Sequence, residues 1–321
     1  MTSLYRYSVY GLVVAIEEPL SSLEPAPDAA ELDTAEPDVT ISFVGHDHFR
    51  RVVPGNIVDL PADHWVSHAF LPDGSIYLLA PDIFEVMVSA DGRRAVCARS
   101  PSVERRMLEA NLLNIVLGTA LTLQGEEPLH STALDLDGRA IGLLGPSGAG
   151  KSSLAAYLVS QGAGLITDDM LRLTFSGERP RAHAGPYRLK LLEDSARRFL
   201  PAAAADGFFN AFSGKVMVRP GPMRRTAEDP VPVAALYSLG DMPRLPSTET
   251  VRAVKLSGME LIRVVLASAM DDRNATPVRL ARQMAFAARL SGAVPVYALR
   301  YPRNFGVMGD VAREIRRTMG Q

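Results

Sequence analysis

The fold of this chain is decided by residues 139–169, which read RAIGLLGPSGAGKSSLAAYLVSQGAGLITDD. Residues 140–144 form a short apolar run that predicts a strand, and residues 153–160 place apolar side chains at helical spacing. Gly162 predicts the end of that helix, and a second apolar run at residues 165–167 predicts another strand. The stretch therefore predicts a strand, a glycine-rich turn, a helix and a second strand.

The glycine-rich turn, residues 145–152, fits the pattern G-x-x-x-x-G-K-S/T at every fixed position. Backbone N–H groups of such a turn can surround a phosphate, because glycine lacks a Cβ and tolerates positive φ. The helix N-terminus adds its partial positive charge. A glycine-rich turn with a chance lysine is the alternative, but the strand before the turn and the helix after it both favour a phosphate loop. We predict that the nucleotide is bound by Gly145, Ser147, Gly148, Ala149, Gly150, Lys151, Ser152 and Ser153.

Two adjacent carboxylates, Asp168 and Asp169, follow the second predicted strand. At the carboxyl end of a strand both side chains can reach the crevice above the sheet. Carboxylates this close repel each other unless a cation lies between them. We expect Asp169 and Ser152 to hold Mg²⁺ and Asp168 to orient or deprotonate an attacking hydroxyl, with the reverse assignment of the two aspartates open. An acidic turn after a strand is the alternative.

Composition restricts the class of protein. The chain has 321 residues, 47% of them apolar and 22% charged, which is typical of a globular protein with room for two domains. A net charge of −2 argues against a general nucleic-acid binder. No apolar run reaches the length of a membrane span, so we expect no membrane partner. Cys97 is the only cysteine, which excludes an internal disulfide and favours a reducing, cytoplasmic location.

The first hundred residues are expected to form a β-rich domain. Short strand-like runs, one of them at residues 57–58, alternate with Asp-Gly turn signals at positions 73–74 and 91–92. Residues 17–38 hold eight acidic residues, four prolines and no Lys or Arg, which predicts an exposed loop. We favour a solvated connector over a lid or partner-binding loop. Trp65, the only tryptophan, is expected in a core or at a domain interface.

The rest of the chain is expected to form a connecting helix over residues 101–128 and a second domain over residues 129–321. An Asp-Gly turn at positions 137–138 predicts a hairpin that places His130 near the phosphate loop. An isolated His beside a strand is more often structural. Between residues 179 and 225, ten Lys/Arg face three acidic residues, which predicts a surface for phosphate or an acidic substrate. Further helices are expected after Ser257, which begins a capping-box pattern, and after Thr276.

Residues 130–169 resemble the catalytic core of HPr kinase/phosphorylase and its relatives, which share a histidine one hairpin before a Walker A loop and two aspartates shortly after it. The wider layout resembles HPr-kinase-like proteins found with lasso-peptide biosynthesis, through a YRxxGL-like strand at residues 5–12 and a Pro-x-Tyr-x-Leu-x-Tyr-Pro strand at residues 295–302. The resemblance implies ATP- and Mg²⁺-dependent phosphorylation of a serine, for the lasso-type kinases the C-terminal serine of a precursor peptide. It also implies that His130 is a site residue.

The sequence therefore predicts an α/β fold, with a P-loop kinase core whose mixed sheet is flanked by helices and with a smaller N-terminal β-rich domain. We predict a serine kinase in which Asp168, His130, Lys151 and Arg188 are catalytic, with Arg188 neutralising charge in the transition state. A nucleotide-dependent ATPase or switch and a small-molecule kinase are the alternatives. We find no glycine-rich second motif of the bacterial HPr kinase/phosphorylases, and a homo-oligomer is left open.

Overall fold

The computed structural model describes residues 4–23, 32, 34–53, 66–210, 213–220, 230–240, 251–270 and 275–320. The strand expected at residues 57–58 and Trp65 lie outside the described residues. The chain divides into two compact units. The first comprises Met1–Glu126 with Asp271–Ala275, and the second comprises Glu127–Met270 with Thr276–Gln321.

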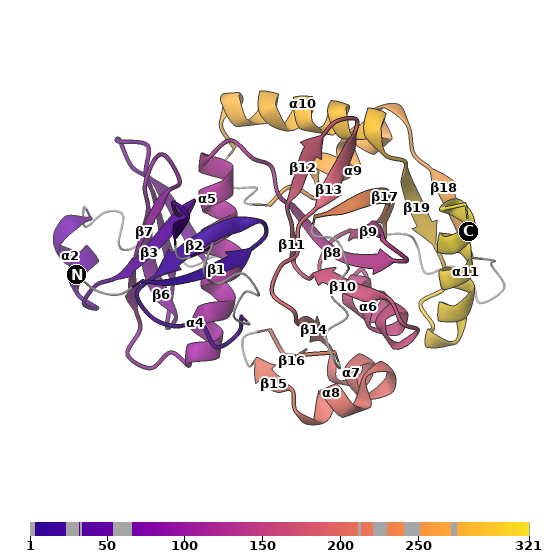
Figure 1. Cartoon of the computed structure of the whole chain (residues 1–321), viewed down its shortest axis with the longest axis horizontal. Helices are drawn as coiled ribbons and strands as arrows, with labels where there is room; N and C mark the ends of the chain where they lie inside the picture. The colour runs from indigo at the N-terminus through magenta and orange to yellow at the C-terminus, as the bar shows by residue number, and fades with distance from the viewer. Residues whose placement is uncertain are drawn as a thin grey trace. The chain divides into compact units, whose positions relative to one another are not determined.

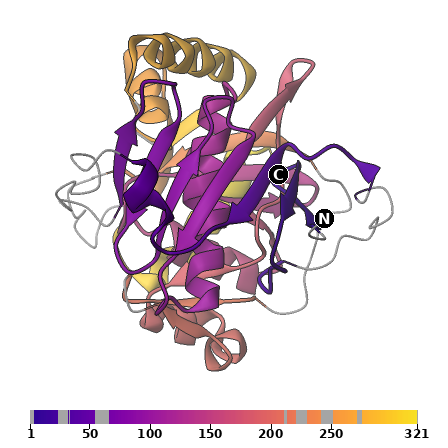
Figure 2. The ribbon, with the colours of Figure 1, turned by 90° about the vertical axis from the view of Figure 1, so that its left-hand side faces the viewer.

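The first unit contains a seven-stranded sheet within the described residues, which confirms a strand-rich N-terminal region. Figure 2 shows its strands side by side. Two of its hairpins turn at the predicted Asp-Gly positions, where Gly74 and Gly92 have φ of 85° and 68°. The strand order is β1 (Tyr5–Val9), β2 (Leu12–Ile16), β3 (Val39–Phe43), β7 (Arg94–Arg99), β6 (Phe84–Val88), β5 (Ile76–Ala80) and β4 (Ser67–Phe70).

The apolar helix expected over residues 101–128 is interrupted by a π-helical turn. It consists of α4 (Arg105–Asn111), the π turn η1 (Leu112–Val116) and α5 (Leu117–Leu123). Most of its apolar residues are buried, and Gln124, the residue after it, binds another part of the first unit. The Gln124 side-chain amide donates to Gly92 O at 2.9 Å. Among the described residues of this unit, one further helix is longer than a single residue, the short α2 (His48–Val52).

The described parts of the acidic segment 17–38 are hydrogen-bonded to the first unit. The Glu17 and Asp38 carboxylates accept from Phe43 N at 2.6 Å and Val13 N at 2.8 Å. Glu109 of α4 accepts from Ser21 N at 2.9 Å. These hydrogen bonds hold the described ends of the segment on the first unit. The ends therefore differ from the freely solvated connector that the sequence favoured.

The second unit contains a mixed nine-stranded sheet within the described residues. Its strands β9, β17 and β19 run parallel, and the remaining pairings are antiparallel. This mixture of strand directions, with helices on both faces, confirms the expected α/β class. The strands along its main path are β10 (Gly164–Thr167), β8 (Leu129–Leu136), β9 (Arg139–Leu144), β17 (Val231–Ser238), β13 (Arg179–Ala182) and β12 (Leu173–Ser176). Off this path, β11 (Met170–Leu171) pairs with β8, β19 (Val296–Arg300) with β17, and β18 (Arg252–Lys255) with β19.

Helices cover both faces of this sheet (Figure 1). One face packs against α6 (Lys151–Ser160) and α11 (Met308–Thr318), and the other against α9 (Gly258–Leu266) and α10 (Pro277–Ala293). Successive strand residues serve opposite faces, as the strand period requires. Tyr237 belongs to the core with α6 and α11, whereas its neighbour Leu236 belongs to the core with α9 and α10.

A separate three-stranded sheet lies against α6 in the second unit. Its strands are β14 (Leu189–Leu191), β16 (Lys215–Val218) and β15 (Phe208–Asn210), with the helices α7 (Glu193–Phe199) and α8 (Pro201–Ala205) beside them. Leu189, Leu191 and Val218 pack into the same core as α6. The alternation in β14 therefore directs the intervening Lys190 away from that core.

A buried ion-pair cluster joins the start of β8 to α10. Arg279 and Glu127 have side chains only 3% and 2% exposed, and Arg279 Nη2 donates to Glu127 Oε2 at 3.1 Å. Arg282 donates to the other carboxylate oxygen at 2.7 Å. A carboxylate removed from such a cluster leaves a buried guanidinium without its counter-charge.

We expect Glu127→Gln to lower the free energy of unfolding by about 3–5 kcal/mol, because Arg279 would then be a buried, uncompensated charge. Glu193→Gln is the matched control, since the Glu193–Arg197 pair is exposed and such helix pairs contribute about 0.3–0.5 kcal/mol. Urea denaturation of both variants measures the difference. Equal, small losses in the two variants would contradict a structural role for the cluster.

Candidate active site

The glycine-rich turn adopts a backbone that only glycine fits without strain. Gly145, Gly148 and Gly150 have φ of 136°, 80° and 101°. A Cβ on Gly145 would lie 2.4 Å from Leu239 O, whereas the space around Gly148 is open. Ser147 is exposed beside it, at the outer part of the turn. This geometry, followed directly by the N-terminus of α6, is suited to an anion.

Lys151, the first residue of α6, lies at the base of this turn and is 7% exposed. Its ammonium donates to Gly145 O at 2.5 Å and to Pro146 O at 3.2 Å. Burial lowers the pKa of Lys151, and the charges of Asp168 and Asp169 oppose that shift. Two carbonyls use two of the three ammonium donors, so a third N–H remains for an incoming phosphate oxygen.

Asp168 is 8% exposed, and each of its carboxylate oxygens accepts a hydrogen bond. Oδ1 accepts from the Thr132 hydroxyl at 2.6 Å, and Oδ2 accepts from Lys190 N at 2.9 Å. Burial raises the pKa of Asp168, and the negative charge of Asp169 adds to this. Asp168 is therefore a more basic carboxylate than an ordinary aspartate, as a general base requires.

Asp169 has a different environment, because its carboxylate forms an ion pair with the Lys190 ammonium. Burial opposes ionisation of Asp169, but the charge and hydrogen bond of Lys190 outweigh it and hold the pKa of Asp169 below its usual value. His130 and Arg188 contribute in the same direction. Asp169 therefore stays ionised, as a cation ligand must be.

The backbone at Asp169 explains how two adjacent side chains reach different partners. Its φ is 71°, in the left-handed region that costs a non-glycine residue about 1–3 kcal/mol. The turn lets β10 end at Thr167 and β11 begin at Met170, and Ser131 N donates to Asp169 O at 3.2 Å. Strain of this kind is found mainly where the surrounding structure fixes a functional geometry.

His130 lies on β8, paired with Met170 of β11, and its backbone N donates to Ser268 O at 2.6 Å. Burial lowers the pKa of the imidazole to about 4, with a further contribution from Lys151, while Asp169 opposes the shift. Lys190 and Lys215 also lower it. His130 is therefore a neutral imidazole at neutral pH, which can donate one hydrogen bond and accept another but supplies no fixed positive charge.

The remaining predicted residues are distributed around this cluster. Ser152 is the second residue of α6 and is half-buried, as is Ala149 in the turn. The Ser153 hydroxyl is hydrogen-bonded to that of Ser195 at 2.8 Å, so it ties α6 to α7. Arg188 lies close enough to Asp169 to lower its pKa. The roles assigned to all these residues stay predictions.

Two residues of this cluster, Thr132 and Lys215, were not predicted from the sequence. Thr132 lies two residues after His130, and that spacing places both side chains on one face of β8, so the signal was present. Lys215 comes from β16, far along the chain, and no local pattern marks it. Lys190 belongs to the basic stretch between residues 179 and 225, but its ion pair with Asp169 was not predicted.

Asp169 and Ser152 are the residues that could hold a cation at this site. Within the described ranges, no group of three or more His, Cys, Asp and Glu side chains could hold a metal ion. Mg²⁺ bound with phosphates needs only one or two carboxylates and keeps several waters. Asp169 and the Ser152 hydroxyl supply oxygen ligands of that kind, and a cation beside them would relieve the repulsion between the two carboxylates.

Comparisons with known proteins give little beyond this geometry. No protein-family model matches the sequence, and no curated protein matches it. Among solved structures, the HPr(Ser) kinase/phosphatase from Coxiella burnetii aligns over 60% of this chain and 99% of that chain, with 16% identity and a TM-score of 0.31. A TM-score this low indicates only a distant likeness, which supports no conclusion about the site. None of the helices in the described residues has the length and apolarity that crossing a bilayer requires.

We expect Thr132→Val to raise the pKa of Asp168 further, because the Thr132 hydroxyl stabilises the ionised carboxylate. The loss of this buried hydrogen bond should also cost about 1–3 kcal/mol of unfolding free energy. Carbon-detected NMR titration of labelled aspartate carboxyls measures the shift. Thr174→Val is the control, since that hydroxyl bonds His183 rather than an aspartate. An unchanged or lowered pKa of Asp168 in Thr132→Val would contradict the assignment.

Proposed function

We propose that the chain is an ATP- and Mg²⁺-dependent phosphotransferase that phosphorylates a serine hydroxyl in a peptide or protein, with the C-terminal serine of a lasso precursor peptide as one such acceptor. The observation that carries the proposal is the contrast between two adjacent carboxylates beside a phosphate loop. Asp168 is buried with neutral donors, while Asp169 is paired with a cation. Groups whose environments move their pKa values apart are typical of paired acid–base and electrostatic roles.

The proposed transfer uses each group once. The acceptor oxygen forms a bond to the γ-phosphorus as the bond from that phosphorus to the β,γ-bridging oxygen breaks, and ADP leaves. The hydroxyl proton passes to Asp168, whose oxygens each keep a second lone pair. Lys151 and Arg188 offset the charge of the outer phosphates. Mg²⁺, when bound by Ser152 and Asp169, would neutralise charge on the phosphate oxygens.

Serine as the acceptor rests on the resemblance of residues 130–169 to the HPr kinase core, since the site itself does not distinguish one alcohol from another. His130 fits the transfer as a neutral hydrogen-bond partner of the transferred group, because its pKa of about 4 excludes the imidazolium at neutral pH. The ATPase or switch and the small-molecule kinase are outcomes of the same experiment.

We expect Lys151→Ala to lose both ATP binding and transfer, and Asp168→Asn to keep ATP binding while transfer falls about 10²–10⁴-fold. Mass spectrometry of candidate peptides incubated with ATP and Mg²⁺ detects the phosphorylated product, and calorimetry measures ATP binding. Lys255→Ala and Asp310→Asn are matched controls, because both side chains are exposed and lie outside the cluster.

The same experiment separates the alternatives. Full transfer by Asp168→Asn would exclude Asp168 as the base. Release of phosphate with no phosphorylated acceptor would indicate an ATPase, and phosphorylation of free hydroxyl metabolites alone would indicate a small-molecule kinase.

The raised pKa of Asp168 predicts a pH dependence with a definite sign. The base must be ionised to accept the proton, so kcat/KM should fall as the pH drops, with its acid limb at a higher pH than an ordinary aspartate gives. Thr132→Val should move this limb to still higher pH. A profile that is flat from neutral pH down to the ordinary range of aspartate would contradict the role of Asp168.

A further inference from the structure

A pocket of about 420 Å³ lies beside the phosphate loop, in the second unit. Gly145 and Pro146 form one wall, and the other walls come from α9 and from the ends of strands β17 and β19. These strands run parallel to β9, with Ser238 paired to Leu144, so their carboxyl ends meet at this edge. Ligands of α/β proteins commonly bind at that edge.

The pocket shares backbone groups with the catalytic cluster. Gly145 and Pro146, which line the pocket, accept hydrogen bonds through their carbonyl oxygens from the Lys151 ammonium. Ser268, another lining residue, accepts through its carbonyl from His130 N at 2.6 Å. A molecule in the pocket therefore lies one residue away from both Lys151 and His130.

The charged side chains of the pocket favour an anion. Arg263 and Arg300 line it together with one carboxylate, Glu260. Arg300 Nε is buried and has no hydrogen-bond partner among the described residues. Buried donors are nearly always paired in native proteins, so an unpaired one indicates a group kept for a ligand or a water molecule.

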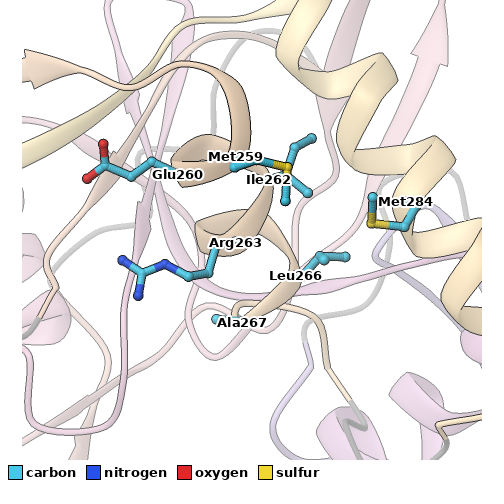
Figure 3. Close-up of a pocket in the computed structure, with 7 residues that line it drawn as sticks. All are labelled: Met259, Glu260, Ile262, Arg263, Leu266, Ala267 and Met284. Carbon is cyan, nitrogen blue, oxygen red and sulfur yellow. The ribbon is translucent and has the colours of Figure 1, made fainter.

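The direction of the α9 side chains supports this interpretation. Figure 3 shows the Glu260 carboxylate and the Arg263 guanidinium pointing away from Met284, with which they line a largely apolar groove of about 570 Å³ on α9 and α10. The helix thus presents its apolar side chains to the groove, while its two charged groups also line the pocket beside the loop.

We propose that this pocket is the acceptor site, and that the acceptor carries a carboxylate which Arg263 and Arg300 bind. The proposal rests on the proposed phosphotransfer and leaves its chemical step unchanged. Two guanidiniums and one carboxylate sum to a single positive charge, which a carboxylate balances, whereas a phosphate at neutral pH carries nearly two negative charges. Guanidinium groups bind carboxylates through two parallel hydrogen bonds, which would orient the hydroxyl as well as hold the acceptor. Among the described lining residues none is aromatic, so no aromatic ring there would stack a nucleobase.

The test measures binding of small acceptors to the full chain in the presence of ADP and Mg²⁺, by calorimetry or saturation-transfer NMR. N-acetyl-L-serine offers an α-carboxylate, N-acetyl-L-serinamide offers none, and N-acetyl-L-aspartyl-L-serinamide offers a side-chain carboxylate. We expect one or both carboxylate compounds to bind about tenfold or more tightly than the serinamide, and the stronger of the two identifies the source of the carboxylate.

Variants test the residues. Arg263→Gln and Arg300→Gln should each weaken binding of the carboxylate compound about tenfold, with ATP affinity unchanged, and Glu260→Gln should strengthen it. Arg252→Gln is the control, because this exposed arginine on β18 is not among the described residues lining the pocket. Arg263 is exposed, so its variant is informative even if Arg300→Gln does not fold.

Equal binding of the carboxylate compounds and the serinamide, or binding that both pocket variants leave unchanged, would overturn the proposal. The proposed function fails independently of it. Carboxylate-dependent binding without phosphoryl transfer to any acceptor would keep the pocket and reject the kinase. Transfer to amidated acceptors, indifferent to Arg263 and Arg300, would keep the kinase and reject the pocket.

Discussion

Two carboxylates on adjacent residues cannot both be buried and charged unless something separates or neutralises them, and the candidate site is built around that constraint. The left-handed backbone at Asp169 turns the two side chains toward different partners. Asp168 receives two neutral donors and keeps a raised pKa, while the Lys190 ammonium keeps Asp169 ionised. The strain at Asp169 therefore has a chemical consequence, because it gives two identical side chains different partners and opposite pKa shifts, as the proposed roles of base and cation ligand require.

Local signals in the sequence were enough to predict the strand, turn and helix around Lys151, since glycine positions and apolar spacing act within a few residues. The hairpin through Asp137 and its placement of His130 were confirmed for the same reason. Thr276 caps α10 as expected, through a hydrogen bond from Arg279 N, but the side chain of Ser257 makes no capping bond in the described residues. A Ser or Thr at the N-cap therefore allows a capping hydrogen bond but does not guarantee one, because the bond also depends on the side-chain rotamer and on the local path of the chain.

Long-range features were beyond the sequence patterns. Lys190 and Lys215 come from the small three-stranded sheet, in which β14 and β16 are separated along the chain by α7, α8 and β15. No local sequence pattern indicates that their side chains lie close to the catalytic cluster. The π turn at residues 112–116 likewise left no trace in the apolar pattern, because residues 112–117 are apolar at every position but one. Sequence reasoning therefore found the acids and the loop, but not the ion pair with Lys190 that lowers the pKa of Asp169.

Because the strands of the sheet run in both directions, the cluster of His130, Thr132 and the two aspartates can lie on one side of the phosphate loop and the pocket on the other. Strand β9 has an antiparallel neighbour, β8, and a parallel one, β17. On the antiparallel side, β8 begins where β9 ends, so His130 and Thr132 enter beside the loop and meet the turn after β10. On the parallel side, β17 and β19 also end there, and residues at the ends of both strands line the pocket. A wholly parallel sheet would bring no strand beginning to the loop and so would lack His130 and Thr132 at this point. In the proposed transfer, the change of strand direction at β9 would therefore place the acid–base groups on one side of the phosphoryl group and the space for an acceptor on the other.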